Sequence, residues 1–138
     1  MHCKWSEAIA IFETFAERRH LVLIEEKEDS SFGDRLATYG NGAMSVRLAS
    51  DRGSCHVQVA EVITRPAVWY DMEILRDHLS GRSDGELSLQ AQFDLLESNW
   101  GALTDAFGAG NREATHEQLS ILRKERAKRL FPDFYRNT

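Results

Sequence analysis

Near its start the chain has one apolar helix face, made of residues three or four positions apart: Trp5, Ala8, Ile9, Phe12, Phe15 and Ala16. This period predicts an amphipathic helix over about residues 5–16. The run at 21–24, LVLI, is apolar and rich in β-branched residues, so it predicts a buried strand. The acidic segment at 25–29 is expected to be the polar exit from that strand.

The middle of the chain alternates apolar and polar residues with a period of two. Met44, Val46 and Leu48 alternate with Ser45, Arg47 and Ala49, and Cys55, Val57 and Val59 alternate with His56 and Gln58. Such alternation predicts strands with one face on the core and the other toward water. Together with a strand at 35–39 and turns at 40–42 and 51–53, it predicts a three-stranded meander from about residue 35 to 60.

Beyond Pro66 the apolar period becomes helical. We predict one helix opened by Trp69-Tyr70 and carrying Met72, Leu75 and Leu79, a longer one over 89–107, and a last one from Thr115. Strands grouped before helices indicate an α+β fold. The expected fold is a single domain over 1–138, with an N-terminal helix, a four-stranded and mostly antiparallel sheet, and three C-terminal helices packed on one face.

One stretch carries several reactive side chains together: Ser50, Asp51, Cys55 and His56. Consecutive residues of a strand point to opposite faces, so Cys55 and His56 cannot form a catalytic pair. Cys55 belongs to the apolar set and is interpreted as a small core residue, whereas Ser50 and Asp51 flank a turn. We therefore predict no catalytic residue.

The sequence contains no recognisable cofactor or metal motif. The glycines at 40–42 lack the spacing of a phosphate loop, and no histidine or cysteine pair has zinc-site spacing. Cys3 and Cys55 without an export signal predict reduced thiols, a cytoplasmic location and no disulfide framework. No apolar run is long enough to span a bilayer, so no membrane partner is expected.

The net charge of −5 is unevenly distributed. Residues 1–110 hold ten basic and eighteen acidic side chains, whereas residues 111–138 hold seven and four. The acidic part favours a basic partner and disfavours nucleic acid. The basic run Arg123–Arg129 is interpreted as compensation of a helix C-terminus, with nucleic-acid binding as the alternative.

The predicted polar surface supplies the candidate partner-binding residues. They are the acidic exit, the outward residues of the meander and two aromatic residues of types enriched at interfaces: Glu25, Glu26, Glu28, Asp29, Arg47, His56, Gln58, Trp69 and Tyr70.

Four runs carry a resemblance to known proteins: SFGDRL at 31–36, VRLASDRG at 46–53, WYD at 69–71 and NW at 99–100. They are similar to segments of a group of small bacterial cytosolic α+β proteins. In size, acidity and element order the chain resembles immunity proteins of polymorphic-toxin and contact-dependent inhibition systems. The resemblance implies a non-enzymatic protein that binds and masks a partner, such as a cationic toxin domain.

Two other classes of function stay open. A small enzyme or ligand-binding domain would use a pocket between sheet and helices, with Cys55 or His78 as participants. A nucleic-acid-binding protein would use the basic C-terminal helix.

Overall fold

The computed structural model describes residues 3–29, 34–61, 68–81, 85–108 and 110–131. Its elements follow in this order: α1 (Trp5–Arg18), β1 (Val22–Asp29), β2 (Asp34–Gly40), β3 (Met44–Asp51), β4 (Ser54–Glu61), β5 (Tyr70–Asp71), α2 (Met72–Ser80), α3 (Leu89–Ser98), α4 (Trp100–Ala106) and α5 (Arg112–Leu130). The predicted α+β class is confirmed.

The strands form one sheet in the order β1-β2-β3-β4-β5, with each neighbouring pair antiparallel. The predicted meander is confirmed in β2, β3 and β4. Its first turn works as the sequence indicates, because Gly42 takes a positive φ of 91° and the Asn41 side chain accepts the N–H groups of Ala43 and Met44, each at 3.0 Å.

The sheet has five strands rather than the four predicted, because Trp69-Tyr70 does not open a helix. Tyr70 and Asp71 form β5 and pair with Val59 and Gln58 of β4, and α2 begins only at Met72. In the described residues four helices, not three, follow the sheet, because the helix expected over 89–107 is interrupted at Asn99. The Asn99 side-chain amide donates to the Leu95 carbonyl at 3.0 Å, a local bond that competes with regular helix geometry.

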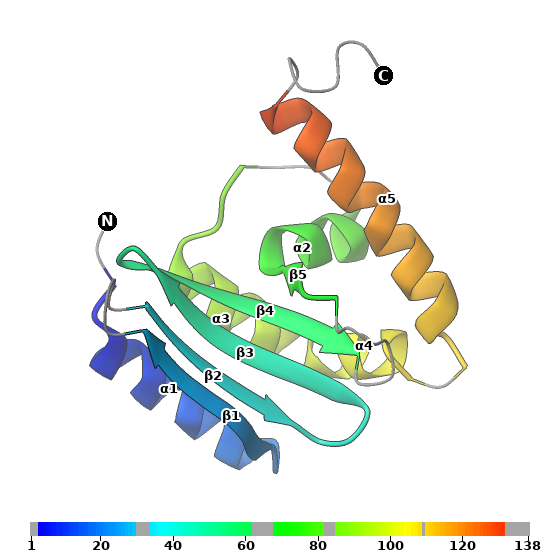
Figure 1. The fold of residues 1–138 in the computed structure, drawn as a ribbon. Coiled ribbons are helices and arrows are strands. Elements are labelled where there is room, and N and C mark those ends of the chain that lie inside the picture. Colours follow the sequence, from blue (N-terminus) through cyan, green and yellow to red (C-terminus); the bar gives the residue numbers. More distant parts are fainter. Residues whose placement is uncertain (1–2, 30–33, 62–67, 82–84, 109, 132–138) are drawn as a thin grey trace.

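The helices supply the apolar cover for one face of the sheet. Figure 1 shows the strands in front of α1, α3 and α4, with α5 packed along α2. The inward strand residues Val46, Leu48, Val57 and Val59 are fully buried, as are Phe12 of α1 and Leu96 of α3. Burying each such side chain stabilises the fold by about 1.5–3 kcal/mol. Figure 1 shows no described helix over the opposite face, which is called the outer face below.

One cluster of buried side chains joins the sheet to all five helices through Phe12, Leu75, Phe93, Leu103 and Leu119. None of the described helices is both long enough and apolar enough to cross a membrane.

Candidate functional site

A row of polar side chains crosses the outer face at its middle. Strand register places Glu25 beside Thr38, Thr38 beside Arg47, Arg47 beside Gln58 and Gln58 beside Asp71, so the row spans all five strands. Directly opposed residues share a face of the sheet. The structure therefore brings together Glu25, Arg47 and Gln58 of the predicted partner-binding residues and adds Asp71.

Arg47 is the centre of this row. Its Nε donates to Oε1 of Gln58 at 2.6 Å, and Nε2 of Gln58 donates to Oδ1 of Asp71 at 2.7 Å. The guanidinium carbon of Arg47 lies 4.1 Å from the centre of the Trp69 ring, within the range of a cation–π contact. Burial lowers the pKa of the Arg47 guanidinium, while the nearby Asp71 and Glu25 carboxylates raise it. Arginine nevertheless stays charged at neutral pH.

His56 lies one row away on the same face, beside Ala49, which in turn lies beside Leu36. Its side chain is exposed, and Cys55 is buried on the helix side, so the predicted separation of these neighbours is confirmed. Arg47, Gln58 and Trp69 are half-buried. We call Glu25, Arg47, His56, Gln58, Trp69 and Asp71 the outer-face cluster.

The sequence predicts an acidic loop at Glu25–Asp29 after the first strand. This prediction is wrong, because these residues belong to β1. Strand alternation divides them between the two faces. Glu25 opposes Thr38 on the outer face, whereas Glu26 and Glu28 oppose Ala37 and Arg35 on the helix side. Glu28 pairs with Arg35 there at 3.0 Å. The side chain of Asp29 lies outside the described residues.

Tyr70 is not at the predicted surface, because its side chain is 1% exposed. Its hydroxyl lies 2.6 Å from Nδ1 of His116, and Arg123 lies over its ring at 5.5 Å. Burial raises the pKa of the Tyr70 phenol, although Arg123 acts in the opposite direction. Tyr70 therefore connects β5 to α5 inside the fold.

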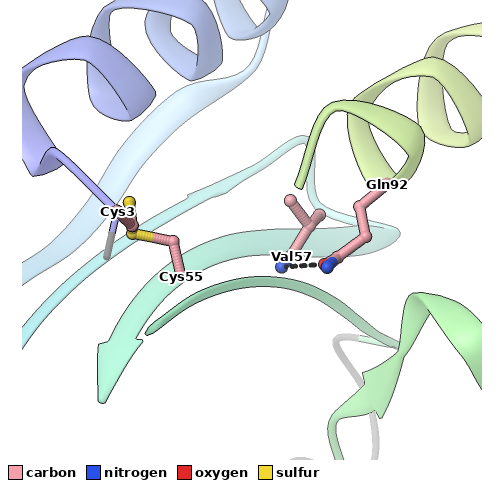
Figure 2. Close-up of a disulfide and its surroundings, with 4 residues drawn as sticks. All are labelled: Cys3, Cys55, Val57 and Gln92. Carbon is pink, nitrogen blue, oxygen red and sulfur yellow. Dashed lines mark hydrogen bonds between the residues drawn. A yellow bond between two sulfur atoms is a disulfide. The ribbon is translucent and has the colours of Figure 1, made fainter. Parts of the chain in front are cut away.

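The prediction of reduced thiols is also wrong, because Cys3 and Cys55 form a disulfide (Figure 2). Their Cα atoms are 5.7 Å apart, and they are separated by 52 positions in the sequence. The backbone N–H of Cys3 donates to the Gly53 carbonyl at 2.7 Å, which holds the segment before α1 against the β3–β4 turn. This tertiary contact brings Cys3 to the helix side of the sheet, toward which Cys55 points.

A cleft of about 460 Å³ lies beside the disulfide. Its walls come from the start of α1, the start of β4 and residues 86–93, and they include Lys4, Glu7, His56 and Leu87. This volume is in the range of small-ligand sites. Among the buried residues of its wall is a polar one, Gln92, whose side-chain oxygen accepts the Val57 N–H at 2.8 Å (Figure 2).

The cleft does not supply the chemistry of the predicted enzyme alternative. The Cys55 sulfur is bonded to Cys3, so it is not a thiolate nucleophile. His78 lies on α2 and does not line the cleft. Within the described ranges, His, Cys, Asp and Glu side chains form no group of three or more that could hold a metal ion.

Two arginines of the basic run on α5 make contacts within the fold. Arg123 lies over Tyr70 and donates to the Trp69 carbonyl at 3.5 Å, and Arg129 lies 3.8 Å from the Asp77 carboxylate. The run therefore helps to attach α5 to α2 and β5.

Comparison with known proteins identifies no relative: no family model, no curated protein and no solved structure matches the chain. The resemblance to immunity proteins therefore stays a prediction.

Proposed function

We propose that this chain is a non-enzymatic protein-binding module whose partner docks on the outer-face cluster. The observation that carries the proposal is the stack of Arg47 on Trp69, held by Gln58 and Asp71 on a face that no described helix covers. Arginine and tryptophan are enriched among residues that dominate binding energy. Side chains already fixed in place lose less conformational entropy when a partner binds.

The contacts of Arg47 leave hydrogen-bond donors available at the centre of the outer face. Within the described part of the chain, Arg47 uses its Nε in a hydrogen bond, and its two terminal nitrogens make none. Those nitrogens are available to an acceptor oxygen of a partner, such as a backbone carbonyl. The carboxylates of Glu25 and Asp71 on either side of Arg47 favour basic groups around that contact.

Charge indicates the class of partner. The protein carries a net charge of −5, and residues 1–110 hold eighteen acidic against ten basic side chains. A partner with a basic surface would be steered toward this part of the molecule. The specific form of the proposal is an immunity-type or inhibitor-type protein that masks a cationic toxin domain.

A cytoplasmic location has less support than the sequence alone indicates. That expectation depends in part on reduced thiols, whereas Cys3 is bonded to Cys55. Disulfides persist mainly in oxidising compartments. Trapping thiols with an alkylating agent in cells that make the protein would establish which state exists there, and free Cys3 and Cys55 would support the cytoplasm.

The test of the proposed function begins with photo-crosslinking in cells that naturally produce the protein. A photoreactive amino acid replaces His56 on the outer face or, as a control, the exposed Ala102 of α4. A protein captured from position 56 and not from 102 is then purified, and its binding to the purified chain is measured by calorimetry. We expect a basic partner that binds directly.

A matched pair of arginine variants tests the site itself. Arg47→Ala and Trp69→Ala should each weaken binding at least about tenfold, as expected for anchor residues. Arg35→Ala removes the same charge from the helix side of the neighbouring strand and should leave affinity within about twofold. Circular dichroism verifies that each variant is folded. Equal affinities of wild type, Arg47→Ala and Trp69→Ala would refute the proposal.

A further inference from the structure

The two edges of the sheet are treated differently by the fold. At the β4 edge, β5 pairs with Gln58 and Val59. Beyond the end of β5, the side chain of Gln92 accepts the backbone N–H of Val57, which β5 does not reach. Figure 2 shows this side chain reaching from α3 to the strand. The β4 edge is thus covered in part by a short strand and in part by an amide side chain that replaces a strand.

The β1 edge has no such cover in the described part of the chain. β1 pairs with β2 alone and lies at the end of the strand order, and no described backbone group other than those of β2 bonds to it. Every second residue of an edge strand directs its N–H and C=O away from the sheet. A second strand could therefore add here.

The side chains of β1 are unusual for an unprotected edge. Val22, Leu23 and Ile24 are 67%, 47% and 59% exposed. Proteins commonly protect edges with short strands, charged side chains (lysine above all), proline or bulges. β1 is eight residues long and has no proline, and its charged residues occupy only 25–29, so charge does not protect its apolar start. An irregularity between Leu23 and Glu25 gives some protection, but pairing with β2 is regular from Glu25 onward.

Acidic side chains beside β1 indicate what would bind. Glu13 and Glu17 of α1 and Glu26 of β1 lie close enough to Tyr39 to act on its phenol. Burial is the main cause that raises the pKa of this phenol, and the negative charges of the three glutamates raise it further. These three carboxylates have no cationic partner within the described residues. A segment that supplies lysine or arginine on this side would satisfy them.

A second copy of the chain fits this edge poorly. In an antiparallel pair of two β1 strands, the apolar start of each strand would lie beside the acidic end of the other. In the pairing that places Val22 opposite Asp29, Glu25 of each strand lies opposite Glu26 of the other, so like charges meet at the centre and apolar residues meet charged ones at the ends. The edge is therefore better suited to a partner of opposite charge.

We propose that β1 binds an extended, basic segment of the partner protein by strand addition, with apolar side chains over Val22–Ile24 and basic ones beside Glu13, Glu17 and Glu26. This inference rests on the proposed protein-binding function and adds the mode of recognition. Backbone hydrogen bonds supply the affinity, and alternating side chains supply the specificity.

The test uses synthetic peptides of the same length as β1, eight residues. One alternates valine and lysine, a second alternates valine and glutamate, and a third is the lysine peptide with N-methyl groups on alternate residues. We expect the lysine peptide to bind and to shift the amide NMR signals of β1. N-methylation removes the donated hydrogen bonds and should weaken binding at least about tenfold. The glutamate peptide should bind more weakly still.

Variants of the protein sharpen the same test. Val22→Lys adds a protecting charge to the edge and should weaken peptide binding several-fold, whereas Ile121→Lys changes an exposed aliphatic residue on α5 and should have no effect. Glu26→Gln should weaken the lysine peptide and strengthen the glutamate peptide. Each variant is checked for an unchanged unfolding midpoint.

Four outcomes would overturn the inference. They are no detectable binding of the lysine peptide, unchanged binding after N-methylation, shifts confined to the outer-face cluster, and a concentration-dependent dimer that Val22→Lys abolishes. If Trp69→Ala prevents partner binding while Val22→Lys does not, strand addition is refuted and the proposed function stands. If the lysine peptide binds β1 but Arg47→Ala and Trp69→Ala leave partner affinity unchanged, the outer face is refuted and the edge remains.

Discussion

The side-chain oxygen of Gln92 accepts the backbone N–H of Val57 across 35 positions of sequence, at 2.8 Å. The Gln92 amide nitrogen donates to the Leu87 carbonyl at 3.1 Å, so both ends of the amide are used. One buried glutamine therefore satisfies a strand edge and fixes the segment that leads into α3.

Gln92→Leu should lower the free energy of unfolding by about 1–3 kcal/mol, because it leaves the Val57 N–H buried without an acceptor. Urea-induced unfolding followed by circular dichroism measures the loss. Gln90→Leu is the control, because Gln90 is exposed and bonds to Asp94 on the same helix. Equal stability of the two variants would show that water or a rearranged strand replaces the bond.

Removal of the disulfide should lower the free energy of unfolding by about 4 kcal/mol, the value that a chain-entropy model gives for a closed loop of this length. Cys3→Ser, Cys55→Ser and the double variant should lose similar amounts, because each breaks the same bond. A thiol assay on the purified, unreduced protein should detect no free cysteine. If reduced wild type unfolds at the same urea concentration as the oxidised protein, the bond does not stabilise the fold.

Asp77→Ala should lower the free energy of unfolding by about 3 kcal/mol, because it removes a buried carboxylate that pairs with arginines of α2 and α5. Arg76 lies 3.0 Å from one oxygen of this carboxylate and Arg129 of α5 lies 3.8 Å from the other, and the Asp77 side chain is buried. Asp94→Ala, on an exposed position of α3, is the control and should cost less than about 0.5 kcal/mol. Similar losses in both variants would contradict the structural role of Asp77.

The protein should lose stability as the pH rises above 10.0, the ordinary pKa of tyrosine. Burial is the main cause that raises the pKa values of the Tyr39 and Tyr70 phenols in the folded state. The folded protein thus keeps protons that the unfolded chain releases. The stabilisation is complete below the unfolded pKa and is lost as the pH rises through the folded value.

Urea midpoints measured at about pH 9 and about pH 11 test this expectation. Tyr39→Phe and Tyr70→Phe should each reduce the difference between the two midpoints, and the double variant should reduce it most. A difference that is unchanged in the double variant would assign the alkaline loss of stability to other groups.

The central strands were predictable because their two faces have different environments. Val46, Leu48, Val57 and Val59 face the helices while Arg47 and Gln58 face outward, so apolar and polar residues alternate. The same logic correctly separated Cys55 from His56. β1 gives no such signal beyond its apolar start, because an edge strand with both faces exposed tolerates consecutive acidic residues. Glutamate and aspartate are otherwise depleted in strands.

Other features depend on contacts that no local pattern records. β5 has two residues and exists because β4 offers it an edge. The interruption at Asn99 is hidden by apolar residues that keep helical spacing on both sides of it. Pairing of Cys3 with Cys55, and of Gln92 with Val57, joins distant segments. Three of the six residues of the outer-face cluster, Arg47, His56 and Gln58, were therefore predictable from strand alternation. The contact of Asp71 with Gln58 could be found only from the pairing of β5 with β4.

The disulfide also determines how the molecule would respond to mechanical force. A pull on the two ends of the described chain would travel through the Cys3–Cys55 bond, and α1, β1, β2 and β3 all lie inside the covalent loop that this bond closes. Those four elements would be shielded from tension while the segments after Cys55 were stretched. Reduction would expose them to the load, so the redox state would change which half of the fold yields first.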